Sequence, residues 1–276
     1  MTGQGLDEAG FIVREGSLDR VSPVFAPVVA AARAAVGAAF GPDRLHSGYL
    51  YGSIPRGTAV AGRSDLDLLL ALHREPDAVD RASAEAVQEH LDAVWPQIDG
   101  VGILLFGVGT LLGELERHDL GWFLACLCTP LTGPDLADRL PRYRPTPLLA
   151  RETNGDLPRL LPRWRARAAD IATTSDPTGR RDEARRVLCR GAARTIVRTG
   201  FTLVMPRWNG WTSDLAESAE AFAPYYPERA EQMRTAAAAA RSGSPDPAVL
   251  ALLLEDLGPW LAAEYTAVHG PKTPRP

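Results

Sequence analysis

The first half of the chain alternates short apolar runs with helical patterns. Residues 21–40 form an alanine-rich run and predict a helix, with Ser22 and Pro23 at its start and Gly41 at its end. Residues 76–94 also have helical spacing. Three short apolar runs predict strands, at 47–52, 66–72 and 98–106. This order of elements is a mixed α/β pattern.

The second half has a different pattern. Strand signals fade beyond about residue 133, and alanine, leucine and arginine recur with helical spacing at 156–174, 180–203, 213–241 and 246–268. Closely spaced prolines make residues 140–147 the expected linker. We therefore expect an α/β domain at 20–138 and a helical domain at 148–268. The tail after residue 268 is expected to be disordered.

The composition is that of a globular protein: 276 residues, of which 45% are hydrophobic and 23% charged. No run of apolar residues is long enough to span a membrane, and residues 1–16 lack the basic and apolar regions of a secretion signal. We therefore expect a cytoplasmic protein. Cys126, Cys128 and Cys189 match neither a disulfide framework nor a zinc spacing, and are expected to be reduced structural thiols.

Charge is distributed unevenly along the chain. The net charge is −4 and the pI is near 5.8, so we do not expect a nucleic-acid partner. Residues 139–207 nevertheless contain 16 arginines and 6 acidic residues, a local charge of +10 that leaves −14 for the rest. Only Lys272 is a lysine. Recognition of phosphate by basic side chains within the fold must therefore use arginine.

The most informative segment is residues 51–70, YGSIPRGTAVAGRSDLDLLL. Gly52 and Ser53 follow an apolar run, and small residues in such a turn let backbone N–H groups and a hydroxyl approach phosphate oxygens. Asp65 and Asp67 stand two residues apart at the start of an apolar strand, so the period of two places both on one face. Adjacent carboxylates repel each other, and Mg²⁺ that also binds a nucleotide phosphate would neutralise them.

The glycine–serine turn and the pair of aspartates are two half-motifs. Together they resemble the signature of the DNA polymerase beta nucleotidyltransferase superfamily. The pattern GSxxRG followed by SDxDLL is similar to that of bacterial minimal and antibiotic-modifying nucleotidyltransferases. The resemblance implies a polymerase beta-like mixed-sheet α/β domain followed by an all-helical C-terminal domain. It also implies a phosphate-binding turn at Gly52 and Ser53, phosphate contacts at Arg56 and Ser64, and catalytic metal ligands at Asp65 and Asp67. A fainter similarity to antibiotic-modifying relatives extends over residues 131–135, 188–200 and 219–227.

The superfamily also uses a third carboxylate on the neighbouring strand, as a metal ligand or as the base that deprotonates the acceptor hydroxyl. Asp99 is the candidate, because it opens the apolar run that follows the predicted helix 76–94. The alternative interpretation is an aspartate in a surface turn. In that case Glu114 or Glu116 would be the next candidates.

Two groups in the second half have both a functional and a structural interpretation. Arginines recur every four residues, at Arg186, Arg190, Arg194 and Arg198. In the functional interpretation, these arginines bind the triphosphate, and Arg190 is the expected contact. In the structural interpretation, this arginine stripe is a solvated helix face. Aromatic and acidic residues follow, at Trp208, Trp211, Asp214, Glu217 and Glu220. They would receive a polyol or cationic ligand, or form a helix cap and a helix surface.

The sequence therefore predicts an Mg²⁺-dependent enzyme. It would transfer a nucleoside monophosphate, AMP from ATP, to a hydroxyl of a small molecule and release pyrophosphate. By resemblance, the acceptor is an aminoglycoside-like antibiotic. Two alternatives remain open: nucleotidylation of a protein or tRNA, as in toxin–antitoxin systems, and nucleotide binding without catalysis.

Overall fold

The computed structural model describes residues 4–173 and 180–275, which form two compact units. The α/β unit comprises residues 13–143. The helical unit combines residues 4–12 with residues 144–275, so the beginning of the chain belongs with its second half. The later of the two crossings between the units lies inside the proline-rich stretch 140–147.

The α/β unit contains a four-stranded mixed sheet. Its elements in chain order are η1 (Leu18–Arg20), α1 (Ala26–Arg44), β1 (Leu45–Tyr51), α2 (Ser53–Arg56), β2 (Leu66–Leu72), α3 (Ala78–Val94), β3 (Val101–Gly107), α4 (Val108–Leu111), η2 (Glu114–Glu116), α5 (Leu120–Leu127), β4 (Thr129–Thr132) and η3 (Leu136–Arg139). The strand order is β3-β2-β1-β4. β1 pairs antiparallel with β2 and β4, whereas β2 pairs parallel with β3 through the crossover helix α3.

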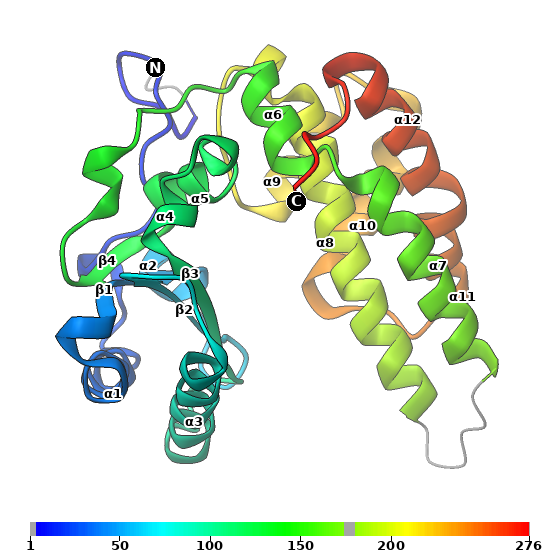
Figure 1. The fold of residues 1–276 in the computed structure, drawn as a ribbon. Coiled ribbons are helices and arrows are strands. Elements are labelled where there is room, and N and C mark those ends of the chain that lie inside the picture. The colour runs from blue at the N-terminus through cyan, green and yellow to red at the C-terminus, as the bar shows by residue number, and fades with distance from the viewer. Residues whose placement is uncertain (1–3, 174–179, 276) are drawn as a thin grey trace. The chain divides into compact units, whose positions relative to one another are not determined.

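Each face of this sheet has its own hydrophobic core. Helices α1 and α3 cover one face, where Leu66, Leu68 and Leu70 of β2 are fully buried (Figure 1). Helices α4 and α5 cover the other face, where Leu69 and Ala71 are fully buried. β2 is thus buried on both faces, and this explains its continuous apolar run.

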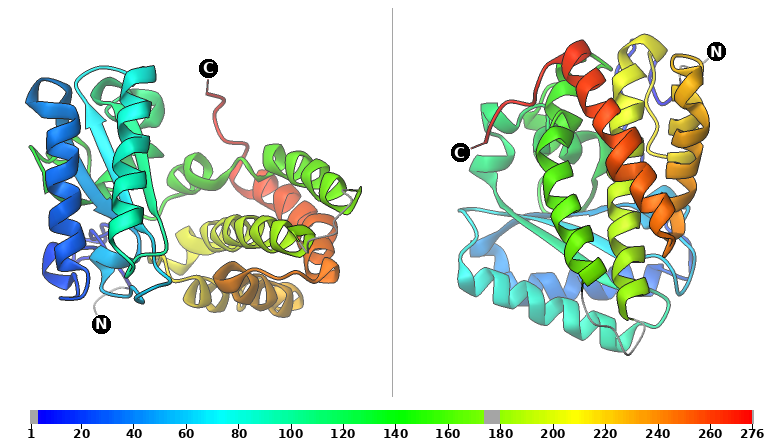
Figure 2. Two further views of the ribbon diagram at one scale, coloured as in Figure 1. Left: turned by 90° about the horizontal axis from the view of Figure 1, so that it is seen from below. Right: turned by 90° about the vertical axis from the view of Figure 1, so that its right-hand side faces the viewer.

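The helical unit is built around α8. Its elements are α6 (Pro147–Asn154), α7 (Leu157–Thr173), α8 (Arg180–Trp208), α9 (Leu215–Phe222), η4 (Pro227–Arg229), α10 (Ala230–Ser242), α11 (Pro247–Ala251), the π-helical turn η5 (Leu252–Leu257) and α12 (Gly258–His269). α8 packs against α6, α7, α9, α10 and α12, and Figure 2 shows these helices from two further directions. Within the described residues, none of the helices combines the length and the apolar character needed to cross a membrane.

The predicted fold class is confirmed: a mixed-sheet α/β region precedes a helical region. β2 has the predicted bounds, whereas the prediction for the first helix is wrong at its start. The carbonyl of Ser22 accepts hydrogen bonds from the N–H groups of Phe25 and Ala26, which forms a turn, and α1 begins only at Ala26. Pro27 rather than Pro23 therefore occupies the first helical turn.

Two further differences have local causes. The predicted helix 213–241 is divided into α9 and α10, because Pro224 and Pro227 supply no N–H donor. β4 has no counterpart among the predicted strands, because it is four residues long, contains Pro130 and lies at the edge of the sheet. Residue 174, the last of one predicted helix, lies outside the described residues.

The prediction of a disordered tail is wrong for residues 271–275. The hydroxyl of Thr273 and a guanidinium nitrogen of Arg275 donate to the Glu152 carboxylate at 2.8 and 3.0 Å. Glu152 is only 5% exposed. Burial alone would raise its pKa, but hydrogen bonds from Thr273, Arg151 and Arg275 lower the pKa to about 2. A buried carboxylate needs such partners, and the tail provides two of them.

The three cysteines are free and buried, as the sequence predicted. Burial raises the pKa of the Cys126 thiol to about 12 and that of the Cys128 thiol well above its ordinary value. Both thiols are therefore protonated at neutral pH and have little nucleophilic character.

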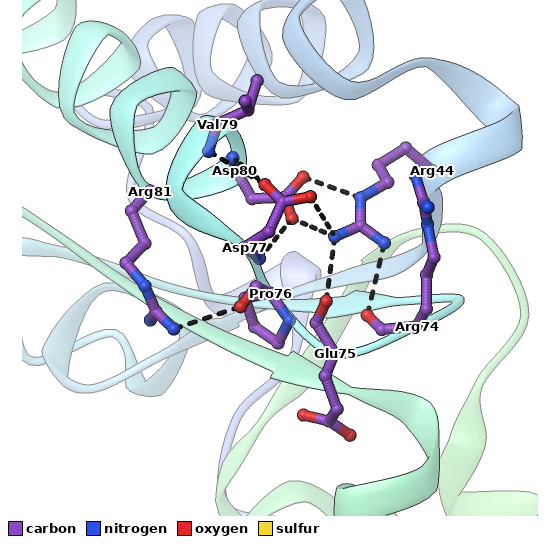
Figure 3. A network of polar contacts seen from close by, with 8 residues as sticks. All are labelled: Arg44, Arg74, Glu75, Pro76, Asp77, Val79, Asp80 and Arg81. Carbon is purple, nitrogen blue, oxygen red and sulfur yellow. Dashed lines mark hydrogen bonds and ion pairs between the residues drawn. The ribbon is translucent and has the colours of Figure 1, made fainter.

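A buried ion pair connects the end of α1 to the start of α3 (Figure 3). The Nε atom of Arg44 donates to Asp80 Oδ1 at 2.7 Å, and its Nη2 atom contacts Oδ2. Arg44 also donates to the carbonyl of Glu75. Asp77 caps α3: its Oδ1 atom accepts from the N–H groups of Val79 and Asp80, while Asp80 Oδ2 accepts from the N–H of Asp77. The network holds the loop between β2 and α3.

We expect Asp80→Asn to lower the free energy of unfolding at pH 7 by about 2 kcal/mol or more, because Arg44 loses its buried charged partner and keeps only the more exposed Asp77, 4.0 Å from Nη2. The hydrogen bond from Arg44 lowers the pKa of Asp80 to about 2. A carboxyl group with a lowered pKa stabilises the fold above its unfolded-state pKa, near 4, and this stabilisation is lost as the pH falls towards 2. In urea unfolding, the difference between the wild type and Asp80→Asn should therefore shrink between pH 4 and pH 2.

The matched control is Asp43→Asn, which removes an exposed carboxylate next to Arg44 in the chain. The free energy of unfolding of Asp43→Asn should remain close to that of the wild type throughout this pH range. A difference between the wild type and Asp80→Asn that is as large at pH 2 as at pH 7 would contradict the role of the ion pair.

Candidate functional site

The paired carboxylates lie at the start of the central strand. Asp65 directly precedes β2 and Asp67 is its second residue, and both are half-buried. Asp67 shares a face of the sheet with Leu69, which packs beneath α4 and α5. The antiparallel register pairs Asp67 with Tyr51, the last residue of β1. The chain segment that follows β1 therefore begins beside the Asp67 carboxylate.

That segment is the glycine–serine turn. Gly52 has φ 80° and ψ −150°, a backbone conformation that is accessible almost only to glycine. A Cβ atom at Gly52 would lie 2.4 Å from Asp67 Oδ2, so a side chain here would also displace the carboxylate. Ser53 begins the short helix α2, and its hydroxyl makes no hydrogen bond within the described part of the chain. The two half-motifs of the sequence are thus in direct contact.

Glycines also flank the carboxylates on the side of β3. The parallel register pairs Asp67 with Gly102, where a Cβ atom would lie 3.3 Å from Asp67 Oδ1. A Cβ atom at Gly100 would lie 3.7 Å from Asp65 Oδ1. The next residue of β3 on this face is Leu104. β3 therefore places glycine, and no carboxylate, next to Asp67.

Asp99 occupies an exposed bend before β3. Its N–H donates to the carbonyl of Ser64 at 3.1 Å, which places its backbone beside the start of the carboxylate strand. Among the described residues, no three carboxylate, histidine or cysteine side chains come together as a metal-binding group. The structure therefore does not join Asp99 to Asp65 and Asp67 as a third metal ligand. Glu114 and Glu116 lie in η2, where Glu114 forms an ion pair with Arg117.

The two predicted phosphate contacts near the turn already bind protein groups. Arg56 Nε donates to the carbonyl of Gly52 at 2.9 Å, and its Nη1 atom lies 4.0 Å from Glu15 Oε2. The hydroxyl oxygen of Ser64 accepts from the N–H of Val60 at 2.9 Å and closes the turn before the carboxylates. Both residues thus support the backbone that carries the motif.

Arg190 belongs to α8 of the helical unit, and its contact with phosphate stays a prediction. It is half-buried, and its Nε atom has no hydrogen-bond partner within the described residues. Two other members of the stripe are engaged: Arg186 pairs with Glu183, and Arg194 donates to the carbonyl of Ala240.

The aromatic and acidic group of the second half has structural roles. Asp214 caps α9, Glu217 accepts a hydrogen bond from Thr212 at 2.6 Å, and Glu220 pairs with Arg234. Trp211 is buried against Phe201. These contacts match the cap-and-surface interpretation of this group.

Sequence reasoning did not identify three residues around the motif. Tyr51 is opposite Asp67 in the ladder, and its ring meets Phe123 of α5 edge to face, with centroids 5.1 Å apart. Glu15 reaches Arg56 from a segment before α1. The position of Tyr51 in the chain is a signal that could have indicated it, because this residue immediately precedes the glycine–serine turn. Phe123 and Glu15 are distant in the chain and leave no local signal.

No protein-family model matches the chain, and no curated protein sequence matches it. Among solved structures, the chain is similar to spectinomycin adenyltransferase AAD(9) from an Enterococcus species, crystallised with ATP and spectinomycin. The two chains are 13% identical, the match covers 87% of this chain and 98% of that one, and the TM-score is 0.48.

Proposed function

We propose that the chain is a nucleotidyltransferase that transfers AMP from ATP to a hydroxyl of a small molecule and releases pyrophosphate. An aminoglycoside-like antibiotic is the proposed acceptor, on the strength of the motif's resemblance. The observation that carries the proposal is the contact between the two half-motifs, in which Gly52 lies against the Asp67 carboxylate. Phosphoryl transfer needs this combination, because phosphate oxygens and metal ligands must share one small space.

The residues at this point fit Mg²⁺. Asp65 and Asp67 offer carboxylate oxygens, and the Asp65 carboxylate has no partner within the residues that the structure describes. On the side of β3, Gly100 and Gly102 place no side chain of their own against the two carboxylates. Mg²⁺ is commonly held by one or two carboxylates together with substrate phosphates. Asp65 and Asp67 would hold the ion, which when bound would neutralise charge on the triphosphate.

In the proposed reaction, the acceptor oxygen forms a bond to the α-phosphorus, the bond from this phosphorus to the pyrophosphate oxygen breaks, and the hydroxyl proton passes to a base. Ser53 and the backbone of its turn would bind phosphate oxygens. Arg56, Ser64 and Arg190 are proposed as further phosphate contacts. Asp99 is proposed to act on the acceptor.

We expect Asp99→Asn to leave the affinity for Mg²⁺ and a nonhydrolysable ATP analogue unchanged, because Asp99 lies outside the carboxylate pair. Transfer should fall by about 10²-fold or more if the residue deprotonates the acceptor. Calorimetry and single-turnover transfer measure these two quantities separately. Loss of affinity and transfer together would make Asp99 a metal ligand, and no change in either would make it a turn residue.

The proposed function is tested by incubating the purified chain with labelled ATP and Mg²⁺ and, in separate reactions, hydroxylated antibiotics, total tRNA and cell proteins. Mass analysis should find a nucleotide adduct on an antibiotic, together with pyrophosphate, and EDTA should prevent its formation. Label on tRNA or protein would instead establish the macromolecular alternative. Nucleotide binding without transfer would overturn the proposed transfer and indicate a non-catalytic protein, and the absence of both would overturn the nucleotide site as well.

A further inference from the structure

The segment before α1 holds the short helix of the glycine–serine turn. The N–H of Glu15 donates to the carbonyl of Cys126 at 2.9 Å, and the carbonyl of Glu15 accepts from Arg20 Nη1 at 2.9 Å. Two residues further on, the N–H of Ser17 donates to the carbonyl of Pro55 in α2 at 3.0 Å. The backbone of Glu15 is therefore fixed on both sides, and the segment that carries it is bonded to α2.

The side chain of Glu15 continues this support. Its Oε2 atom lies 4.0 Å from Arg56 Nη1, and the two side chains are only 17% and 30% exposed. Arg56 Nε in turn donates to the carbonyl of Gly52. A partly buried pair is screened less by water and salt than an exposed one. The Glu15 carboxylate, the Arg56 guanidinium and the Gly52 carbonyl thus form a series of polar contacts. This series ends at Gly52, the residue that faces Asp67.

The position of Gly52 leaves little room for movement. Its Cα atom faces the Asp67 carboxylate so closely that a single added carbon would contact Oδ2. A rotation of the turn would therefore move Ser53 away from the carboxylates or press the backbone into Asp67. A displacement of about 1 Å at a reacting site is enough to reduce a rate by about 10²-fold.

We propose that Glu15 is a positioning residue for the nucleotide site. It holds the Arg56 guanidinium against the carbonyl of Gly52 and so keeps the Gly52–Ser53 turn in the conformation that receives nucleotide phosphates beside Asp67. This role rests on the proposed nucleotidyl transfer. Arg56 acts on the turn through Nε, whichever of its other nitrogens meet a phosphate.

The test compares Glu15→Gln, Arg56→Gln and the double variant with the wild type. Asp19→Asn is the matched control, because it removes an exposed carboxylate from the same segment, and the Asp19 carboxylate has no partner in the described part of the chain. Glu15→Gln should raise the KM for ATP and the dissociation constant of a nonhydrolysable ATP analogue by about 10-fold. The KM for the acceptor should stay the same. If Glu15 acts through Arg56, the double variant should bind nucleotide no more weakly than Arg56→Gln alone.

Hydrogen exchange of the ligand-free protein gives a second readout. The N–H groups of Gly57 and Thr58 donate to the carbonyls of Ile54 and Ser53, so amides over residues 52–58 should exchange faster in Glu15→Gln than in the wild type. Exchange in α3 should be unchanged, which also shows that the variant is folded. In Asp19→Asn, amide exchange over residues 52–58 and in α3 should be the same as in the wild type.

Unchanged exchange and unchanged nucleotide affinity in Glu15→Gln would overturn the positioning role, and so would additive losses in the double variant. Failure of the wild type to bind or transfer nucleotide would overturn the proposed function instead. The exchange experiment needs no nucleotide, so the two failures are distinguishable.

Discussion

Asp67→Asn is expected to abolish nucleotidyl transfer and to leave the fold intact. Asparagine keeps the size of the side chain in the narrow space between Gly52 and Gly102, but it removes the negative charge that would hold Mg²⁺. Groups that stabilise charge in a transition state contribute several kcal/mol, so transfer should fall by at least about 10²-fold. Single-turnover transfer of labelled AMP measures the loss, and urea unfolding checks the fold.

Asp65→Asn should cause a loss of the same order, since the two carboxylates would share the ion. Asp92→Asn is the matched control, because Asp92 is an exposed carboxylate on α3, a helix that covers the opposite face of the sheet. It should transfer at the wild-type rate. Wild-type turnover in Asp67→Asn would rule out the metal assignment, whatever the other variants show.

The sequence predicts the central strand of the fold well because one physical signal dominates there. β2 is buried on both faces, so an unbroken run of leucine defines it without help from distant residues. β4 lacks such a signal: it has four residues, includes Pro130 and, in the described part of the chain, pairs with no strand except β1. Similarly, residues 271–275 are held by hydrogen bonds to the buried carboxylate of Glu152, which is far away in the chain, so the local sequence does not predict their structure.

In the candidate site, too, the sequence predicts what local patterns determine and not what depends on distant residues. Period-two alternation and the GS…DxD spacing are local, and they were sufficient to select Gly52 and Asp67, which the structure brings into contact. The third carboxylate depends on the register between β2 and β3. Asp99 precedes β3 by two residues, and the ladder pairs Asp67 with Gly102. Inter-strand hydrogen bonds set this register, and the apolar run alone does not reveal it.

Gly52→Ala is expected to be as damaging to transfer as the loss of a carboxylate, although it removes no chemical group. Two costs coincide at this residue. An alanine at φ 80° and ψ −150° is strained by about 1 to 3 kcal/mol, and its Cβ atom would lie 2.4 Å from Asp67 Oδ2. Either the turn or the carboxylate must move, so transfer should fall by about 10²-fold or more. The free energy of unfolding should fall by at least the strain.

Gly37→Ala is the matched control, because Gly37 is exposed in α1 and a Cβ atom there meets nothing within 4 Å. It should raise the free energy of unfolding by about 0.5 to 1 kcal/mol and leave transfer unchanged. Combining Gly52→Ala with Asp67→Ala separates the two costs, since alanine at position 67 removes the contacting oxygen but not the backbone strain. Urea unfolding should then show a smaller effect of Gly52→Ala in the Asp67→Ala background than in the wild type. Equal effects in both backgrounds would show that the turn does not press on the carboxylate, and the contact on which the proposed site depends would be refuted.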